Sequence, residues 1–167
     1  MKTLKYFFQS IIILTLFFLF KILGLKLSSN VSSILIGIIG PFFRSKKVTH
    51  ANILKAYPNL PLKEINKISK EMWSNYGRIL SEYMFMKKFS KPNFKYNLKI
   101  EGQEILEKIK ENNEQVIFVS GHFNNFELMA MHIEKTGINL AAIYRPLNNK
   151  FLNYFMEKIR KKYICKN

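Results

Sequence analysis

The stretch that decides the predicted fold is Val116-Ile117-Phe118-Val119-Ser120-Gly121-His122-Phe123-Asn124-Asn125-Phe126-Glu127-Leu128. Its first four residues are apolar and rich in β-branching, which predicts a buried strand over residues 116–119. A glycine follows, and Asn124 or Asn125 is placed to cap a helix beyond it. His122 therefore lies where a strand gives way to a helix, at the edge where open α/β sheets hold their ligands.

His122 is a candidate general base. A neutral imidazole can take a proton from an alcohol, and a carboxylate on its other nitrogen fixes the tautomer and stabilises the resulting cation. Glu127 follows five residues later, about one and a half helical turns along, and can reach back to the ring. The alternative interpretation is two unrelated polar residues at a helix entrance, since a His and a Glu at this spacing are common.

The second half of the chain alternates predicted strands and helices. Residues 94–101 alternate apolar and polar side chains, as a half-buried strand does. A helix is predicted over 103–110, a strand over 138–143, another helix after it, and the start of a further strand at 163–165. This order is typical of a mostly parallel sheet with right-handed crossovers, so the predicted fold class is α/β.

The amino-terminal part of the chain is apolar and predicts attachment to a membrane. Residues 6–27 would form a helix of roughly 33 Å, enough to cross a bilayer core of about 30 Å. A cleaved signal peptide is the alternative, because residues 1–5 make a basic start, although no small-residue cleavage site follows. A shorter apolar run over 31–43 predicts an interfacial helix, and the basic residues after it suit anionic headgroups.

A long amphipathic helix is predicted over residues 62–88, where apolar side chains recur at spacings of three and four. Arg78 and Glu82 lie four residues apart on this helix and could simply pair on its surface. Pro58 and Pro61 precede the helix and predict a turn.

The composition favours an anionic partner. There are 27 Lys and Arg against 11 Asp and Glu, a formal net charge of +16. A phosphorylated lipid surface, an acidic carrier protein or nucleic acid would suit this charge, but no nucleic-acid-binding motif occurs, so we expect no nucleic-acid partner. A low-GC genome, which enriches Lys, Asn and Ile together, is an alternative cause. Cys165 is the single cysteine and the three histidines have no ligand spacing, so we expect no disulfide and no metal.

Four motifs together resemble those of the bacterial lipid A biosynthesis acyltransferases, the late lauroyl/myristoyl transferase family. The first is His122, four residues, then Glu127; the second is Tyr-Arg-Pro at 144–146. Further upstream, residues 52–58 look like the family's Asn…Phe-Pro segment and residues 77–82 like its Gly/Glu helix. The resemblance therefore runs over nearly the whole chain. It departs at two positions, Asn124 where the family usually has Gly and Phe126 where it usually has Trp.

The resemblance implies transfer of a fatty acyl chain from acyl carrier protein to a hydroxyl of a lipid A precursor or another phosphorylated glycolipid, without a cofactor. His122 would be the base and Glu127 its orienting carboxylate. Arg145 would hold a lipid phosphate, although a surface arginine before a turn is the alternative, and Glu82 and Asn125 would contribute to substrate binding. The resemblance also implies the bacterial inner membrane, with the catalytic domain on the cytoplasmic side.

We expect three regions: a membrane anchor at 1–30, an interfacial and helical region at 31–93, and an α/β catalytic core at 94–167. The resembled family continues well beyond this length, so the core is expected to be incomplete at its carboxyl end and inactive or poorly folded alone. Two other functions remain open. One is a phosphatidylinositol mannoside or glycerolipid acyltransferase, and the other is a non-catalytic fragment tethered to the membrane.

Overall fold

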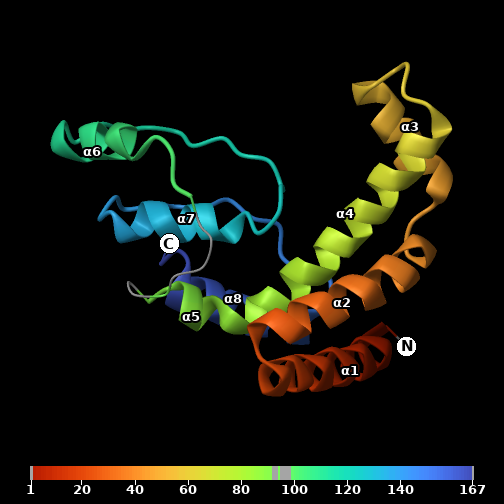
Figure 1. The fold of residues 1–167 in the computed structure, drawn as a ribbon. Helices are drawn as coiled ribbons and strands as arrows, with labels where there is room; N and C mark the ends of the chain where they lie inside the picture. The colour runs from red at the N-terminus through yellow and green to blue at the C-terminus, as the bar shows by residue number, and fades with distance from the viewer. Residues whose placement is uncertain (1, 92–93, 95–98, 167) are drawn as a thin grey trace. The chain divides into compact units, whose positions relative to one another are not determined.

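The computed structural model describes residues 2–91, 94 and 99–166 (Figure 1). The elements of this part are α1 Lys2–Leu23, α2 Leu25–Ile39, η1 Gly40–Phe42, α3 Lys46–Ala56, α4 Leu62–Glu82, η2 Tyr83–Phe85, α5 Met86–Phe89, α6 Gln103–Glu111, α7 Glu127–Lys135 and α8 Lys150–Tyr163.

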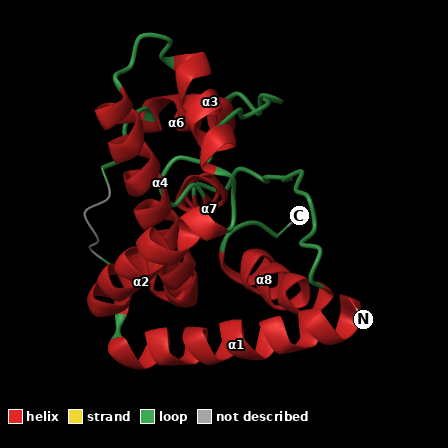
Figure 2. Ribbon diagram, turned by 90° about the vertical axis from the view of Figure 1, so that its right-hand side faces the viewer, coloured by secondary structure: helices red, strands yellow, loops and turns green. Residues whose placement is uncertain are grey.

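The predicted α/β fold with a mostly parallel sheet is wrong, because the described residues contain helices and loops but no strand (Figure 2). Half of the predicted strand at 94–101 lies outside the described residues, and its described residues, like those at 116–119 and 138–143, form no strand. Ile117 and Val119, expected to be buried, are 92% and 91% exposed. A β-branched run fits a pleated surface, but a neighbouring strand must supply the ladder of hydrogen bonds, so the run alone does not make a sheet.

The helix predictions agree with the structure more closely than the strand predictions, because a helical periodicity lies within one segment of the chain. The helix expected over 103–110 is confirmed as α6, and the amphipathic pattern after residue 150 forms α8. The single helix expected over 62–88 is instead divided. Its α-helical part, α4, ends at Glu82, and a 3-10 turn leads into the short α5.

The chain forms two compact units. The first unit comprises Met1–Leu16 and Phe85–Asn167, and so contains the first part of α1 with α5, α6, α7 and α8. The second unit is Phe17–Met84 and contains the end of α1 with α2, α3 and α4. Gly24 joins α1 to α2 at a φ of 77°, a backbone conformation that a residue without Cβ adopts most readily.

In the second unit, α2 packs along α4 through small residues (Figures 1 and 2). Ser33 Oγ lies 2.6 Å from Ser74 Oγ, and a Cβ added to Gly77 would overlap the carbonyl oxygen of Ser32. Such close approach of two backbones is typical of helix pairs in membranes. We name the buried serines of α2 the serine seam: Ser28, Ser29, Ser32 and Ser33.

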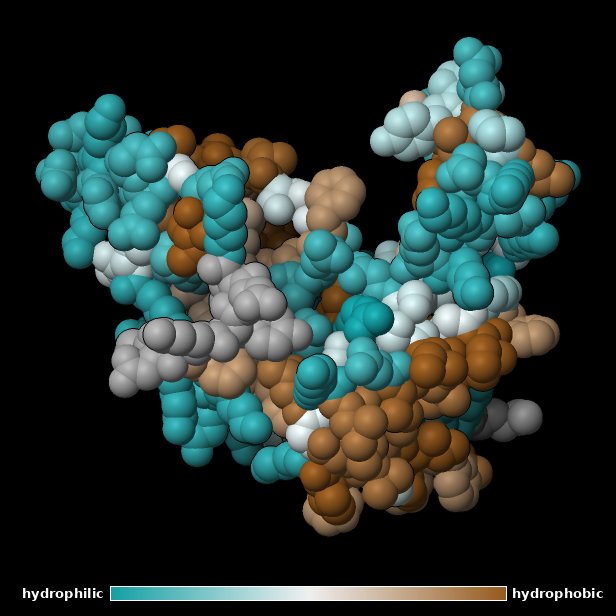
Figure 3. All heavy atoms as spheres, in the orientation of Figure 1, coloured by the Kyte–Doolittle hydropathy of each residue, from teal (hydrophilic) through white to brown (hydrophobic). Residues whose placement is uncertain are grey.

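The opposite face of α2 exposes large apolar side chains, namely Leu27, Val31, Ile34, Leu35 and Ile38. The brown surface in Figure 3 follows this helix and α1. Burial of serines and exposure of aliphatic residues is the reverse of the pattern on a helix at a water-exposed surface. The helix α2 thus turns small polar residues to its partner helix and apolar residues outward, as expected of a helix in contact with lipid.

In the first unit, Asn149 joins α8 to α1. Its Oδ1 accepts hydrogen bonds from the amides of Phe151 and Leu152, 3.1 and 3.3 Å away, and so caps α8. The same oxygen lies 3.0 Å from Ser10 Oγ, and the Asn149 amide group donates to the carbonyl of Tyr6 at 2.9 Å. The buried cap therefore also fixes the first half of α1 against the start of α8.

Candidate functional site

His122 lies in the loop that leads into α7, and its side chain is exposed. Its ring meets Phe126 edge-on, with centroids 4.3 Å apart. The expected asparagine cap is absent: the residue preceding α7 is Phe126, and no side chain caps the helix. Asn124 instead takes a left-handed conformation with φ of 46°. Asparagine tolerates this conformation better than most residues, which explains how it can stand where the resembled family usually has Gly.

Glu127, the first residue of α7, is buried and bound by Arg160 of α8. The Nε and Nη2 atoms of Arg160 lie 2.8 and 2.6 Å from Glu127 Oε1. The Arg160 guanidinium also lies 5.3 Å from the ring centroid of Tyr144. The structure thus pairs Glu127 with Arg160, while His122 has its ring contact with Phe126. The His122–Glu127 dyad stays a prediction.

Sequence reasoning missed Arg160, although a signal was present. Arg160 follows Leu152 and Met156 at intervals of four residues, a spacing that places all three on one face of a helix. Leu152 is buried and Met156 half-buried. A cation on an apolar helix face is rarely buried without an acidic partner, so the position of Arg160 in this pattern predicted an acidic partner.

The other predicted site residues lie in different places. Arg145 is exposed in the loop before α8, and Asn125 is half-buried before α7. Glu82 is buried at the end of α4 in the second unit, where it accepts a 3.4 Å hydrogen bond from Ser29 Oγ. Arg78, its expected surface partner, donates to Asn30 Oδ1 at 3.1 Å. Both α4 residues therefore bond to α2.

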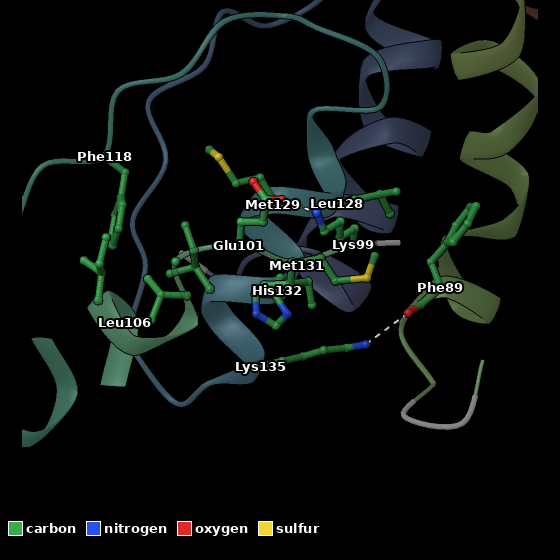
Figure 4. Close-up of a pocket in the computed structure, with 14 residues that line it drawn as sticks. Phe89, Lys99, Glu101, Leu106, Phe118, Leu128, Met129, Met131, His132 and Lys135 are labelled. Atoms are coloured by element: carbon green, nitrogen blue, oxygen red, sulfur yellow. Dashed lines mark hydrogen bonds and ion pairs between the residues drawn. The ribbon is translucent and has the colours of Figure 1, made fainter. Parts of the chain in front are cut away.

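An apolar cavity of about 540 Å³ lies against α6 and α7 (Figure 4). Leu106, Phe118, Leu128 and Met131 are among its lining residues. Lys135 lies at its edge and donates to the carbonyl of Phe89 at 3.0 Å, and burial lowers the pKa of its ammonium group below the ordinary 10.5. A cavity with this lining suits an apolar chain rather than a polar metabolite.

His132 also lines this cavity. Its Nε2 atom is buried without a hydrogen-bond partner among the described residues. In the same part of the chain, no group of three His, Cys, Asp or Glu side chains could hold a metal ion.

Comparison with known proteins gives the family. Residues 1–165 match the family described as bacterial lipid A biosynthesis acyltransferase. One curated relative, lipid A biosynthesis acyltransferase 2 of Shigella flexneri, is 34% identical over 62 residues, which are 37% of this chain and 20% of the relative. The matched part is thus a fifth of that relative's length. No solved structure matches the chain. The family match includes His122, Glu127 and the Tyr-Arg-Pro segment, and it confirms the resemblance: the chain belongs to the bacterial lipid A biosynthesis acyltransferase family.

Proposed function

We propose that the protein transfers a fatty acyl chain from the thioester of acyl carrier protein to a hydroxyl of a lipid A precursor. The family match over 1–165 carries this proposal. It is supported by the exposed position of His122, because a base that acts on a lipid hydroxyl must be open to its substrate.

In the proposed reaction, His122 takes the proton of the acceptor hydroxyl as its oxygen attacks the thioester carbonyl. The tetrahedral intermediate then collapses to the new ester, and the departing thiolate receives the proton from the imidazolium. Glu127 stabilises the imidazolium, and backbone amides of the loop after His122 are candidate donors to the oxyanion. Arg145 binds a phosphate of the acceptor, since its fork can hold two phosphate oxygens.

The proposal assigns the remaining parts as follows. Asn125 and Glu82 contribute to substrate binding, and the apolar cavity against α6 and α7 receives part of the acyl chain. The helices Lys2–Leu23 and Leu25–Phe42 are long and apolar enough to cross a membrane. They would attach the protein to the inner membrane, with His122 on the cytoplasmic side, where acyl carrier protein is found.

Transfer of radiolabelled acyl chains from acyl carrier protein to a lipid A precursor in isolated membranes tests the proposal. His122→Gln should abolish transfer, because an amide cannot take the proton. His50→Gln is the matched control and should retain transfer, with equal amounts of both variants in the membrane fraction. Unchanged transfer by the His122 variant would exclude its role as the base.

A membrane-tethered, non-catalytic protein is the second candidate. The Arg160–Glu127 ion pair favours it, because the pair engages the carboxylate that the dyad requires. Complete absence of transfer by the wild-type chain, with normal membrane attachment, would favour this function.

A further inference from the structure

The exposed apolar face of α2 is followed along the chain by two exposed aromatic residues and then by cations. Phe42 and Phe43 are 88% and 78% exposed. Arg44 follows directly, and Lys46 and Lys47 open α3. Exposed aromatic rings next to basic side chains are typical of the boundary between the acyl chains and the headgroups of a bilayer. We name Arg44, Lys46 and Lys47 the basic cluster.

The start of α3 is an unfavourable place for cations in the protein alone. Its amide groups give the first turn a partial positive charge, and that turn has no acidic residue and no side-chain cap. Among the described residues, the basic cluster forms no ion pair. Residues 17–84 hold ten Lys and Arg against three Glu, so few carboxylates can compensate. A bound anion would relieve this concentration of positive charge.

A cleft beside the basic cluster can receive an amphipathic anion. It has a volume of about 590 Å³ and lies between α3 and α4, which adjoin in Figure 1. Its lining combines Arg44 and Asn52 with apolar Ile53 and Met72 and with the ring of Trp73. Two tyrosines, Tyr57 and Tyr76, also line it and are exposed. Such a lining suits a headgroup together with the first carbons of its chains.

We propose that this cleft binds the phosphate headgroup of an anionic membrane lipid. Arg44 binds the phosphate from the lining of the cleft, and Lys46 and Lys47 add charge at the start of α3. A lipid is favoured over a soluble anion because the exposed apolar residues of α2 and the exposed Phe42–Phe43 pair directly precede Arg44, which lines the cleft. The site requires the proposed membrane attachment, but it is independent of acyl transfer and of His122.

The chain carries its own reporter for this site, because Trp73 is its single tryptophan and lines the cleft. The full chain is reconstituted in bilayers of phosphatidylcholine and phosphatidylglycerol, with bromine on the chains of one lipid at a time. Bromine quenches tryptophan only at close range, so the ratio of the two quenching levels measures the preference of the cleft. We expect brominated phosphatidylglycerol to quench Trp73 several-fold more than its mole fraction in the bilayer alone would give.

Charge removal tests the basic cluster. In the variant Arg44→Gln, Lys46→Gln, Lys47→Gln, the preference should fall by about fivefold or more, since each basic residue near an anionic surface contributes on the order of fivefold. The matched control is Lys63→Gln, Lys67→Gln, Lys70→Gln. It removes the same charge from exposed residues of α4 that do not line the cleft, and should keep the preference.

Three results would overturn the inference. The first is equal quenching by both lipids in the wild type, and the second is an equal loss in the control variant, which would show attraction by net charge alone. The third is release of the brominated lipid by excess inorganic phosphate, which would show a site for soluble anions. Flotation with phosphatidylcholine vesicles checks membrane attachment separately, and failure of the wild type to float would remove the basis of the site.

Discussion

The carboxylate of Glu127 connects the predicted dyad with the ion pair that the structure contains. Its side chain is 7% exposed, against 27% for Arg160. Removing one partner of such a pair leaves a partly buried charge without compensation. We expect Glu127→Gln to lower the free energy of unfolding by about 1–3 kcal/mol, less than for a fully buried pair because Arg160 retains some contact with water. Denaturant unfolding followed by circular dichroism measures this loss.

Two further variants separate structure from catalysis at this residue. Arg160→Met should reproduce the loss of stability but keep acyl transfer if Glu127 acts by orienting His122. Glu157→Gln is the matched control, because its 3.1 Å pair with Lys161 is more exposed, with 33% and 66% of the two side chains accessible. This change should alter stability by no more than about 0.5 kcal/mol. Equal loss of transfer in the Glu127 and Arg160 variants would contradict a direct effect of the carboxylate on His122.

Arg145 is exposed in the loop before α8, so a change there should not disturb the fold. If its guanidinium grips a phosphate, Arg145→Lys should raise the KM for the acceptor about tenfold, because an ammonium group cannot form the bidentate fork. The KM for the acyl donor is the internal control and should stay constant. Wild-type kinetics in this variant would favour the interpretation as a surface arginine.

At the scale of the elements, the close contact between α2 and α4 requires a residue without a side chain at position 77. Gly77→Ala should destabilise the pair by about 1–3 kcal/mol, since the new methyl group overlaps the backbone of Ser32. Gly37→Ala, on the facing helix, is the control. Its Cβ would lie 3.9 Å from Ser74 Oγ, an ordinary contact, and alanine gains up to about 1 kcal/mol in helix propensity. Thermal unfolding in detergent compares the two, and equal stability would show that the helices can separate without cost.

The same contact shows which elements a sequence can predict. The helices α6 and α8 follow from periodicities within one segment, and both were predicted. The strands at 116–119 and 138–143 were wrong, because a strand depends on a partner that its own residues do not specify. The serine seam was missed, although Ser28 and Ser32, like Ser29 and Ser33, recur at an interval of four. Serine does not contribute to an apolar periodicity, although small residues at this spacing are common in membrane helix pairs.

The candidate site likewise has features that the sequence predicts and features that it does not. Sequence alone identified the family, because motifs are short and local, and the role of His122 stays a prediction. It could not predict that Arg160 would bind Glu127, since these residues are 33 positions apart and meet only in the folded chain. Nor could it predict the cleft of the second unit, which two separate helices form.

At the scale of the whole molecule, the proposed attachment to the membrane rests on α1 and α2 rather than on charge. The helix α1 exposes aliphatic and aromatic side chains along its length, and α2 exposes aliphatic ones. Salt screens the attraction between basic residues and headgroups but leaves the transfer of apolar surface into lipid favourable. We therefore expect the full chain to stay in the membrane fraction after washes with high salt or alkaline carbonate. Full-length protein in the wash would leave only electrostatic attachment.

Charge placed within α1 tests the same attachment from the opposite direction. Ile12→Lys with Ile13→Lys puts two cations near the centre of the helix, at about 2.5–3.5 kcal/mol each, and should release the protein into the carbonate wash if α1 is the main anchor. Thr3→Lys with Leu4→Lys adds the same charge at the helix end, where lysines can reach the headgroups, and should leave the protein in the membrane. The mass of the purified protein decides the signal-peptide alternative, because a cleaved chain would lack its first residues. Retention of the central variant in the membrane would show that α2 is sufficient, since its apolar face remains unchanged.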